Sequence, residues 1–237
     1  MTPQLVLLAG GLGTRLGGLT ASTPKSLVRV AGEPFIFHQL RLLQREKIDR
    51  VILCAGHRGE DIRRTIGDGA RFGLRISYCF DGDTLLGTGG ALRRALSLLD
   101  ESFWTLYGDS YLDVPFAPID RHFSSQKRLG LMTVFCNNNR WVPSNILLQD
   151  GRIVRYDKAK PTLEMRHIDF GLGLLRREAL APWKDGDGFD LSELHRRLVA
   201  QGELLSFETS QRFYEIGTPE GLRETEAHIL AKRRANA

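Results

Sequence analysis

The chain has 237 residues, of which 42% are hydrophobic and 26% are charged, and its formal net charge at pH 7 is +5. These proportions are ordinary for a globular protein, and they exclude a disordered chain, a collagen-like repeat and a disulfide-rich scaffold. The length suits one large domain. The basic excess allows an anionic partner, but it does not choose among nucleic acid, a membrane surface and a phosphorylated metabolite.

The cysteine usage and the hydropathy pattern bear on location. Cys54, Cys79 and Cys136 are far apart and lack the spacing of a metal site, which favours reduced thiols and a reducing compartment. The chain has no apolar stretch long enough to span a bilayer, and its start lacks the basic region of a signal peptide. We therefore expect a cytoplasmic protein with no membrane partner.

The first half of the chain alternates between predicted strands and helices. Apolar or alternating segments predict strands at residues 5–9, 51–55, 74–79 and 103–107. Helical spacing of apolar residues predicts helices opened by Pro34, at about 60–66 and at 91–99. This alternation indicates βαβ units in a mostly parallel sheet.

The second half is richer in strands. Strands are predicted at residues 129–136, 146–149, 153–156, 168–175 and 204–208, and helices at 190–200 and 219–232. Asp150-Gly151 between two of these strands is a strong hairpin signal. The basic tail from Lys232 is expected to be frayed. We therefore predict an α/β fold, a Rossmann-like doubly wound mixed sheet with a β-rich insertion.

A glycine-rich loop follows the first predicted strand. It contains Gly10, Gly11 and Gly13, whose backbone N–H groups can bind an anion, and Arg15, whose guanidinium suits phosphate. Alone, such a loop also fits a tight strand-to-helix turn. It is not a P-loop, because no Gly-Lys-Ser/Thr follows, and a dinucleotide fingerprint would need glycine at Leu16.

The wider pattern is more specific than the loop alone. The chain reads Leu8-Ala9-Gly10-Gly11-Leu12-Gly13-Thr14-Arg15-Leu16, then Pro24-Lys25, then Val30-Ala31-Gly32-Glu33-Pro34. In this it resembles the sugar-1-phosphate nucleotidyltransferases. Further matching motifs follow in the family's order: Leu86-Gly87-Thr88-Gly89-Gly90-Ala91, Gly108-Asp109, Tyr156-Asp157-Lys158 and Tyr214-Glu215-Ile216-Gly217-Thr218-Pro219.

The resemblance implies an organisation and a set of site residues. It implies one catalytic domain over 1–237 of the glycosyltransferase-A-like type, with nucleotide bound by about 1–128, sugar phosphate bound by about 129–216, and a closing helix and tail at 217–237. Catalytic roles fall on Arg15, which would hold the β- and γ-phosphates, and on Lys25, which would hold the α-phosphate. The implied nucleotide-binding residues are Leu8, Ala9, Gly10, Gly11, Gly13, Thr14, Asp83, Gly87 and Thr88. The implied sugar-phosphate-binding residues are Asn145, Asp157, Lys158, Asp169 and Gly171.

Several of these residues have simpler structural alternatives. Mg²⁺ would be held by Asp109, at the end of a predicted strand, and by Glu215, where the family usually has Asp. Either carboxylate could instead cap a turn or form a salt bridge. Thr88 could cap the following helix. Lys160 could share the role of Lys158, since period-two alternation would put both on one strand face.

The activity implied is transfer of a nucleotidyl group from an NTP to a sugar 1-phosphate, giving an NDP-sugar and pyrophosphate. Asp81 and Asp83 before the second glycine loop favour guanine, because carboxylates accept hydrogen bonds from its N1–H and N2–H₂ groups. GTP and a heptose or mannose 1-phosphate are therefore the expected substrates. Uridylyl transfer to N-acetylmuramate 1-phosphate, thymidylyl or cytidylyl transfer to glucose 1-phosphate, and a non-catalytic regulator remain alternatives. Homo-oligomerisation is possible, and no nucleic-acid partner is expected.

Overall fold

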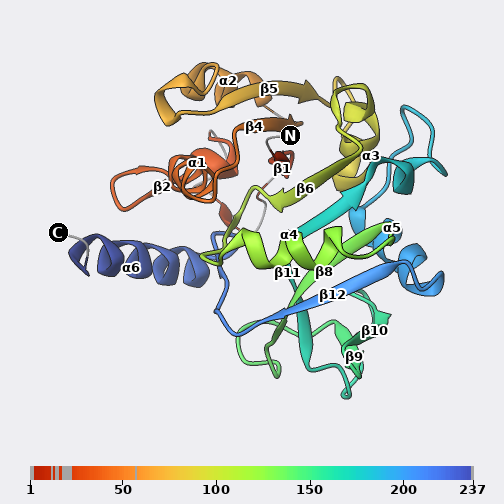
Figure 1. Cartoon of the computed structure of the whole chain (residues 1–237). Coiled ribbons are helices and arrows are strands. Elements are labelled where there is room, and N and C mark those ends of the chain that lie inside the picture. The colour runs from red at the N-terminus through yellow and green to blue at the C-terminus, as the bar shows by residue number, and fades with distance from the viewer. Residues whose placement is uncertain (1–2, 12, 14–15, 18–22, 57, 236–237) are drawn as a thin grey trace.

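The computed structural model describes residues 3–11, 13, 16–17, 23–56 and 58–235. A mixed sheet forms its centre, with the strand order β10-β9-β11-β6-β1-β4-β5, and β8 and β12 joined to it through β11 (Figure 1). The strands of this sheet are β1 (Gln4–Leu8), β4 (Arg50–Ala55), β5 (Arg75–Phe80), β6 (Ser102–Tyr107), β8 (Gly130–Cys136), β9 (Ile146–Gln149), β10 (Arg152–Tyr156), β11 (His167–Arg176) and β12 (Leu204–Thr209). Two short ribbons pair β2 (Arg29–Val30) with β3 (Glu33–Pro34) and β7 (Ser110–Tyr111) with β13 (Tyr214–Glu215).

The sheet changes character where the two halves of the chain meet. β6, β1, β4 and β5 run parallel, whereas β11 lies antiparallel to β6, β8 and β9. In Figure 1 the parallel strands occupy the upper part of the molecule and β8 to β12 the lower part. The predicted Rossmann-like mixed sheet with a β-rich second half is therefore confirmed. Because β6 pairs with β11, one continuous sheet runs through both halves.

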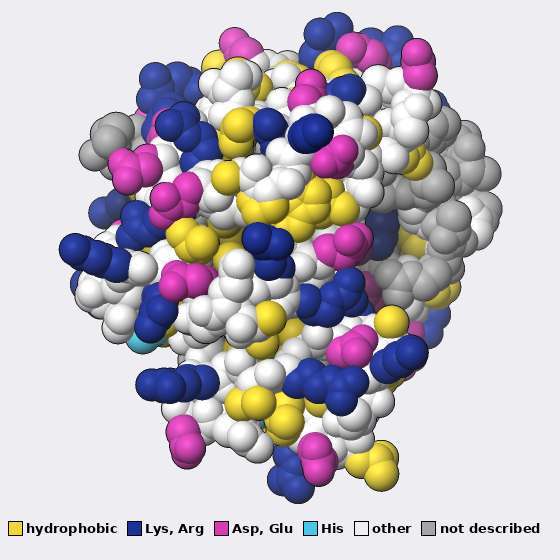
Figure 2. Space-filling view, turned by 90° about the vertical axis from the view of Figure 1, so that its right-hand side faces the viewer, with side chains coloured by type: hydrophobic (Ala, Val, Ile, Leu, Met, Phe, Trp, Pro, Cys, Tyr) yellow, Lys and Arg dark blue, Asp and Glu magenta, His cyan; other side chains and the backbone are white. Residues whose placement is uncertain are grey.

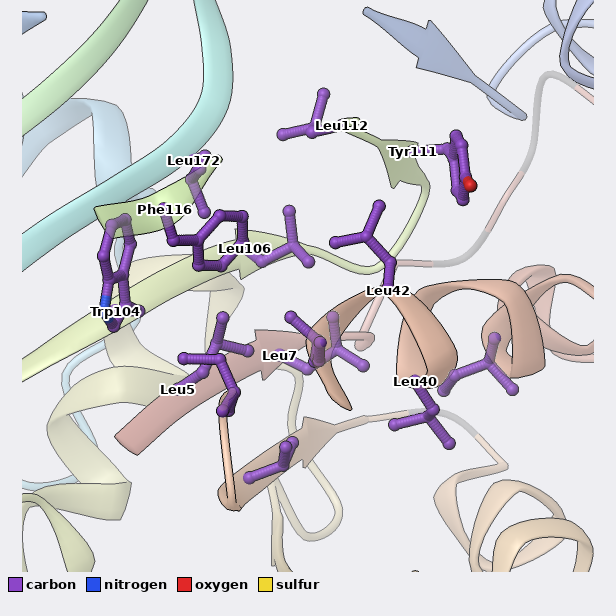
Figure 3. Close-up of a cluster of buried hydrophobic side chains, with 14 of the residues drawn as sticks. Leu5, Leu7, Leu40, Leu42, Trp104, Leu106, Tyr111, Leu112, Phe116 and Leu172 are labelled. Carbon is purple, nitrogen blue, oxygen red and sulfur yellow. The ribbon is translucent and has the colours of Figure 1, made fainter. Parts of the chain in front are cut away.

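Helices cover both faces of the parallel strands. The helices are α1 (Phe35–Arg45), α2 (Gly59–Ile66), α3 (Gly87–Arg94), α4 (Phe116–Ser124), α5 (Leu191–Ala200) and α6 (Pro219–Ala235). Leu5 and Leu7 of β1 point into a core shared with α1, β6 and α4 (Figure 3). Val6 and Leu8 point into the opposite core, shared with α3 and α5. Burial on both faces explains why this strand is a continuous apolar run rather than an alternating one.

The β9–β10 hairpin shows how local sequence decides a turn. Asp150 and Gly151 both adopt positive φ, +49° and +72°. A two-residue loop with positive φ at both positions matches the twist of the flanking strands, and Asp-Gly is among the sequences that favour it. The antiparallel pairing of β9 with β10 confirms the hairpin predicted from this dipeptide.

Three of the α-helices differ from the sequence prediction. The helix expected at 91–99 begins at Gly87, and its α-helical part ends at Arg94, so the second glycine segment is its first turn. Gly89 and Gly90 both donate to the Phe189 carbonyl, and a Cβ on Gly89 would lie 2.2 Å from the Phe189 ring. Only a residue without a side chain fits there.

The other two differences concern α4 and α6. The sequence reading missed α4, whose buried positions Phe116, Ile119 and Phe123 surround a proline in the first turn. The tail expected to fray is helical to Ala235, because Lys232 pairs with Asp113 and the Arg233 guanidinium donates to the Ala31 carbonyl.

The surface carries charges of both signs. Figure 2 shows basic side chains interspersed with acidic ones on the face that it presents, rather than gathered into one continuous basic patch. Among the described residues, no helix combines the length and the apolar character that a membrane crossing requires.

Candidate active site

The centre of the candidate site is an ion pair between Lys25 of the Pro24-Lys25 motif and Asp109 of the Gly108-Asp109 motif. Lys25 lies in a short 3₁₀ turn, Lys25–Leu27, and Asp109 follows β6. The Lys25 Nζ is 2.6 Å from the Asp109 Oδ2, and the exposed fractions of the two side chains are 11% and 32%. Two opposite charges at this distance, both partly shielded from water, attract each other strongly and fix each other's position.

This ion pair lies at a cavity of about 240 Å³. The lining residues are Leu8, Ala9, Gly11, Gly13, Lys25, Ser26, Thr88, Tyr107, Gly108 and Asp109. The structure therefore brings Lys25, Asp109 and Thr88 together with Gly11 and Gly13 of the first glycine loop. Thr14 and Arg15 lie outside the described residues. Gly108 has no room for a side chain, because a Cβ there would be 2.8 Å from both the Ala9 Cα and the Leu8 carbonyl oxygen.

Gln39, a residue that the sequence reading did not single out, fixes the segment that carries Asp109. It is 1% exposed, and its Nε2 donates to the carbonyls of Tyr107 at 3.0 Å and Ser110 at 2.8 Å. These two carbonyls flank Gly108-Asp109. A glutamine within the buried stripe of α1, between Ile36 and Leu43, was the available sequence signal, because a buried amide needs polar partners.

The backbone of the Glu215 segment pairs with the backbone beside Asp109, but the Glu215 carboxylate faces the start of α6. β13 pairs with β7, and the Ile216 N–H donates to the Asp109 carbonyl at 3.0 Å. The Glu215 carboxylate accepts hydrogen bonds from the Thr218 Oγ1, at 2.8 Å, and from the Gly217 N–H, at the start of α6. The structure thus places Glu215 on β13 and Asp109 in the turn just before its partner strand β7, with the Glu215 side chain turned toward α6.

A second cavity, of about 220 Å³, adjoins the first glycine loop. Its lining residues are Leu8, Gly10, Gly11, Cys54, Asp81, Leu85, Gly87, Thr88, Ala91 and Asp190. Asp81 is 5% exposed there, and burial raises the pKa of its carboxyl, against the Leu86 N–H and Arg94, which lower it. Asp83, the one of the two that the resemblance implies as a nucleotide-binding residue, is exposed and does not line the cavity. Of these two carboxylates, Asp81 is therefore the one that reaches this space.

Thr88 does not cap the helix in which it lies. It is within the first turn of α3, and its Oγ1 donates to the Asp190 Oδ2 at 3.0 Å and accepts from the Leu191 N–H at 2.8 Å. Asp190 in turn caps α5 with a capping box completed by Glu193. This contact joins the first turns of α3 and α5 at the rim of the second cavity.

Lys158 and Asp169 form a second charged centre, in the second half of the chain. Their charged atoms are 3.3 Å apart. The Asp169 carboxylate also accepts from the Tyr156 hydroxyl at 2.9 Å and from the Gly171 N–H at 3.0 Å. Burial alone would raise the pKa of Asp169, but Lys158 and these donors lower it overall. The pKa of Lys158 is raised, because Tyr107 and Asp169 outweigh the effect of its burial.

Tyr107 connects the two charged centres. Tyr107 is among the residues that line the cavity of the Lys25–Asp109 pair. Its hydroxyl accepts from the Lys158 Nζ at 3.4 Å and donates to Asp169 at 3.4 Å. Since Tyr107 ends β6 two residues before Asp109, one strand end positions both centres.

Asn145 and Asp157, two other residues predicted to bind the sugar phosphate, accept hydrogen bonds from the backbone around this centre. The Asn145 Oδ1 accepts from the Asp169 N–H at 3.1 Å. The Asp157 Oδ1 accepts from the N–H groups of Ala159 and Lys160, at 3.0 and 2.9 Å. β10 ends at Tyr156, so period-two alternation does not apply to Lys158 and Lys160. The reading that puts both lysines on one strand face is therefore wrong; Lys158 contacts Asp169, and Lys160 is exposed.

The sequence is similar to those of known proteins. Residues 4–143 match the model of the family described as nucleotidyl transferase. The chain is 26% identical to UTP–glucose-1-phosphate uridylyltransferase of Synechocystis sp., over 84% of this chain and 56% of that protein. It is 25% identical to D-glycero-alpha-D-manno-heptose 1-phosphate guanylyltransferase of Campylobacter jejuni, over 92% of this chain and 96% of that protein. The chain thus spans little more than half the length of some curated relatives that it matches, although it spans nearly all of the Campylobacter protein.

The fold is also found among solved structures. HddC from Yersinia pseudotuberculosis, complexed with GMP-PN, matches with a TM-score of 0.78 at 21% identity, over 96% of this chain and 99% of that one. At this identity the likeness shows the fold alone.

His195 gives this region a measurable pH dependence. It is buried and lines, with Asp169, a small cavity of about 10 Å³, and neither ring nitrogen has a hydrogen-bond partner among the described residues. Burial lowers its pKa from 6.5 to about 4, Lys158 adds to the lowering, and Asp169 and Asp190 oppose it. The unfolded chain therefore takes up a proton at His195 below about pH 6.5, whereas the folded chain does not until about pH 4.

We predict that this difference destabilises the fold as the pH falls from about 6.5 to 4, by up to about 3 kcal/mol. Urea unfolding at pH 7 and pH 4.5 measures the free energy at both ends. His195→Leu should lose less stability between these pH values than the wild type, whereas the control His122→Gln should lose as much as the wild type. Equal losses in the wild type and His195→Leu would contradict the assignment.

Proposed function

The chain belongs to the nucleotidyl transferase family, and from that premise we propose that it transfers a nucleotidyl group from an NTP to a sugar 1-phosphate and releases pyrophosphate. The observation that carries this proposal is the Lys25–Asp109 ion pair, 2.6 Å long, at a cavity lined by the first glycine loop. A cation and a carboxylate at one cavity are the groups needed to hold a phosphate and a metal ion.

Among the basic residues that the structure describes, Lys25 is the best placed to bind the nucleotide phosphates. Its side chain is mostly buried and directed at Asp109, so its charge is held at the cavity rather than spread in solvent. An incoming phosphate offers Lys25 a partner of greater negative charge than one carboxylate. We propose that Lys25 then leaves Asp109 for the α-phosphate, and that Arg15 holds the β- and γ-phosphates, as the sequence motif implies.

Asp109 is suited to a divalent cation, and the family generally uses one. Its carboxylate is one-third exposed, and besides Lys25 it accepts only a 3.3 Å hydrogen bond from the Ser110 Oγ among the described contacts. Carboxylate oxygens of this kind suit Mg²⁺. Glu215 would join Asp109 by giving up its bonds to Thr218 and Gly217. When bound, Mg²⁺ would neutralise phosphate charge at the reacting centre.

The centre around Lys158 and Asp169 suits the sugar 1-phosphate. Lys158 is the described cation that faces Asp169 and Tyr107, so it can hold the sugar phosphate, and the neighbouring Asp157, Asp169 and Asn145 offer oxygen atoms to sugar hydroxyls. The shared Tyr107 places this centre beside the cavity of Lys25 and Asp109. The closeness of the two centres favours direct transfer between two bound substrates.

The reaction needs charge neutralisation more than proton transfer. The sugar phosphate is already an anion near neutral pH, so its oxygen can attack the α-phosphorus without a general base, and pyrophosphate leaves from the opposite side. Lys25 and Lys158 reduce the repulsion between the two anions and fix their orientation, and such positioning provides most of the acceleration in this kind of transfer.

The nucleobase is proposed to be guanine, held in the second cavity. Asp81 is buried there and can accept hydrogen bonds from N1–H and N2–H₂ of guanine. The Campylobacter relative is a guanylyltransferase and HddC was solved in complex with GMP-PN, which favours the same base, whereas the Synechocystis relative is a uridylyltransferase. A heptose or mannose 1-phosphate is the proposed acceptor. Cytoplasmic location, a single catalytic domain and a possible homo-oligomer stay predictions from the sequence.

Pyrophosphate release tests this function directly. The protein with Mg²⁺ is given each of ATP, GTP, CTP, UTP and dTTP with each of a panel of sugar 1-phosphates: heptose, mannose, glucose and N-acetylmuramate. We expect release only when one NTP, GTP first among them, and one sugar 1-phosphate are present together. Binding of NTP without release for any pair would favour a non-catalytic regulator.

We predict that Asp109→Asn lowers the turnover number by about 100-fold or more, because it removes a charged ligand of the metal while leaving the volume unchanged. The matched control is Asp120→Asn, which neutralises an exposed carboxylate on α4. Steady-state pyrophosphate release measures both variants. Activity of Asp109→Asn within a few fold of the control would remove Asp109 from the metal site.

We predict that Asp81→Asn lowers the preference for GTP over UTP by about 10- to 100-fold, because a lost charged hydrogen bond in a buried site costs about 1.5–3 kcal/mol. Asp83→Asn is the control, since it neutralises the exposed carboxylate two residues away. The ratio of kcat/KM values for the two nucleotides decides the outcome. An unchanged ratio in Asp81→Asn, or a changed ratio in Asp83→Asn, would contradict the role of Asp81.

A further inference from the structure

Three potential metal ligands gather on the second half of the sheet, outside the cavities of Lys25, Asp109 and Asp81. They are Cys136, His167 and Glu208, and one ligand atom of each lies within 4.8 Å of the other two. The His167 Nε2 is 3.2 Å from the Glu208 Oε1. We refer to these three residues as the β8–β11–β12 cluster.

The register of the strands independently places the three side chains together. Cys136 ends β8, and it is directly opposite His167 at the start of antiparallel β11. Glu208 of β12 is opposite Val134, two residues before Cys136 on β8. Residues directly opposite, and residues two apart on one strand, share a face of the sheet. The cluster therefore follows from strand pairing and not only from side-chain rotamers.

The chemistry of the cluster favours one class of metal. A thiolate, an imidazole and a carboxylate together are the ligand types that Zn²⁺ takes in proteins, at about 2.3, 2.0–2.1 and 2.0–2.2 Å. Mg²⁺ prefers oxygen ligands alone. Tetrahedral ligand atoms around zinc lie roughly 3.3–3.8 Å from one another at those bond lengths. Separations within 4.8 Å are close enough for small side-chain rotations to complete the site.

We propose that the β8–β11–β12 cluster binds a single Zn²⁺ ion with three protein ligands and one solvent position. Glu208 and Cys136 are exposed, and the His167 side chain is 15% exposed, so an ion can enter from solvent. The Asn138 Nδ2 donates to the Cys136 Sγ at 3.4 Å. Such a donor to the ligating sulfur is typical of the outer hydrogen bonds that orient metal ligands.

The ion would fasten three strands next to the proposed sugar-phosphate centre. Among the described residues, β12 pairs with β8 alone, so zinc would tie this outer strand to β11 as well. The His167 carbonyl accepts from the Asn145 N–H at 2.9 Å. The Asn145 side chain accepts in turn from the Asp169 N–H. The bound ion would therefore stabilise this part of the sheet, and this role does not depend on the proposed nucleotidyl transfer.

Cobalt substitution tests the proposal with a signal that only a thiolate ligand produces. Metal-free protein, prepared with a chelator and a reducing agent, is titrated with Co²⁺, and the near-ultraviolet charge-transfer band from thiolate to Co²⁺ is recorded. We expect the band to saturate at one Co²⁺ per chain and to be displaced by one equivalent of Zn²⁺. Thermal unfolding should shift to higher temperature with Zn²⁺, because the ion binds only the folded arrangement.

Variants separate this site from the others. Cys136→Ser should abolish the band, and Glu208→Gln should weaken Zn²⁺ binding by more than about 10-fold, since loss even of outer partners of a ligand costs about 10- to 100-fold. Cys79→Ser and Asp109→Asn are the controls and should leave the band unchanged. No band at one equivalent, or a band that survives Cys136→Ser, would overturn the proposal and leave His167–Glu208 as a plain surface salt bridge.

Discussion

The ion pair between Lys25 and Asp109 is the interaction on which the site depends. It joins two segments 84 residues apart in the sequence, and neither charge is fully in water. Removing one partner from such a pair leaves the other partly buried and uncompensated, which is costly. The Gln39 amide holds the backbone on either side of Asp109, and the Ile216 N–H donates to the carbonyl of Asp109 itself. The packing of α1 and β13 is thereby linked to the position of one carboxylate.

The same strand end connects the two halves of the molecule. β6 is the last parallel strand before the sheet continues into antiparallel β11. Tyr107 at its end contacts Lys158 and Asp169 of the second half, while Asp109, two residues on, contacts Lys25 of the first. A ligand held by either centre therefore lies close to the other. A transfer reaction between two bound anions requires such an arrangement, and a simple binding protein does not.

Much of the fold was predictable from the sequence because it depends on local patterns. The continuous apolar run of β1 indicated burial on two faces, and Asp150-Gly151 indicated the hairpin. Where packing over long distances decides, the prediction was wrong or incomplete. The start of α3 at Gly87 depends on the Phe189 carbonyl, about a hundred residues away, and α4 was missed for lack of a distinct signal around its proline.

The site shows the same division. Motif spacing brought Lys25, Asp109 and Thr88 into consideration, and the structure places them at one cavity. The choice between Asp81 and Asp83 depends on which of two neighbouring carboxylates turns inward, which sequence alone does not specify. The cluster of Cys136, His167 and Glu208 has no sequence spacing to reveal it, because the register of three strands creates it.

The measurement that tests this account most directly is Mn²⁺ binding to the nucleotide-free protein, followed by electron paramagnetic resonance. If Lys25 competes with the metal for Asp109, Lys25→Met should bind Mn²⁺ at least about 10-fold more tightly than the wild type, since 1.4 kcal/mol of lost competition is tenfold in affinity. The gain should disappear in the double variant Lys25→Met with Asp109→Asn. Equal affinity in the wild type and Lys25→Met would contradict the central role of the ion pair.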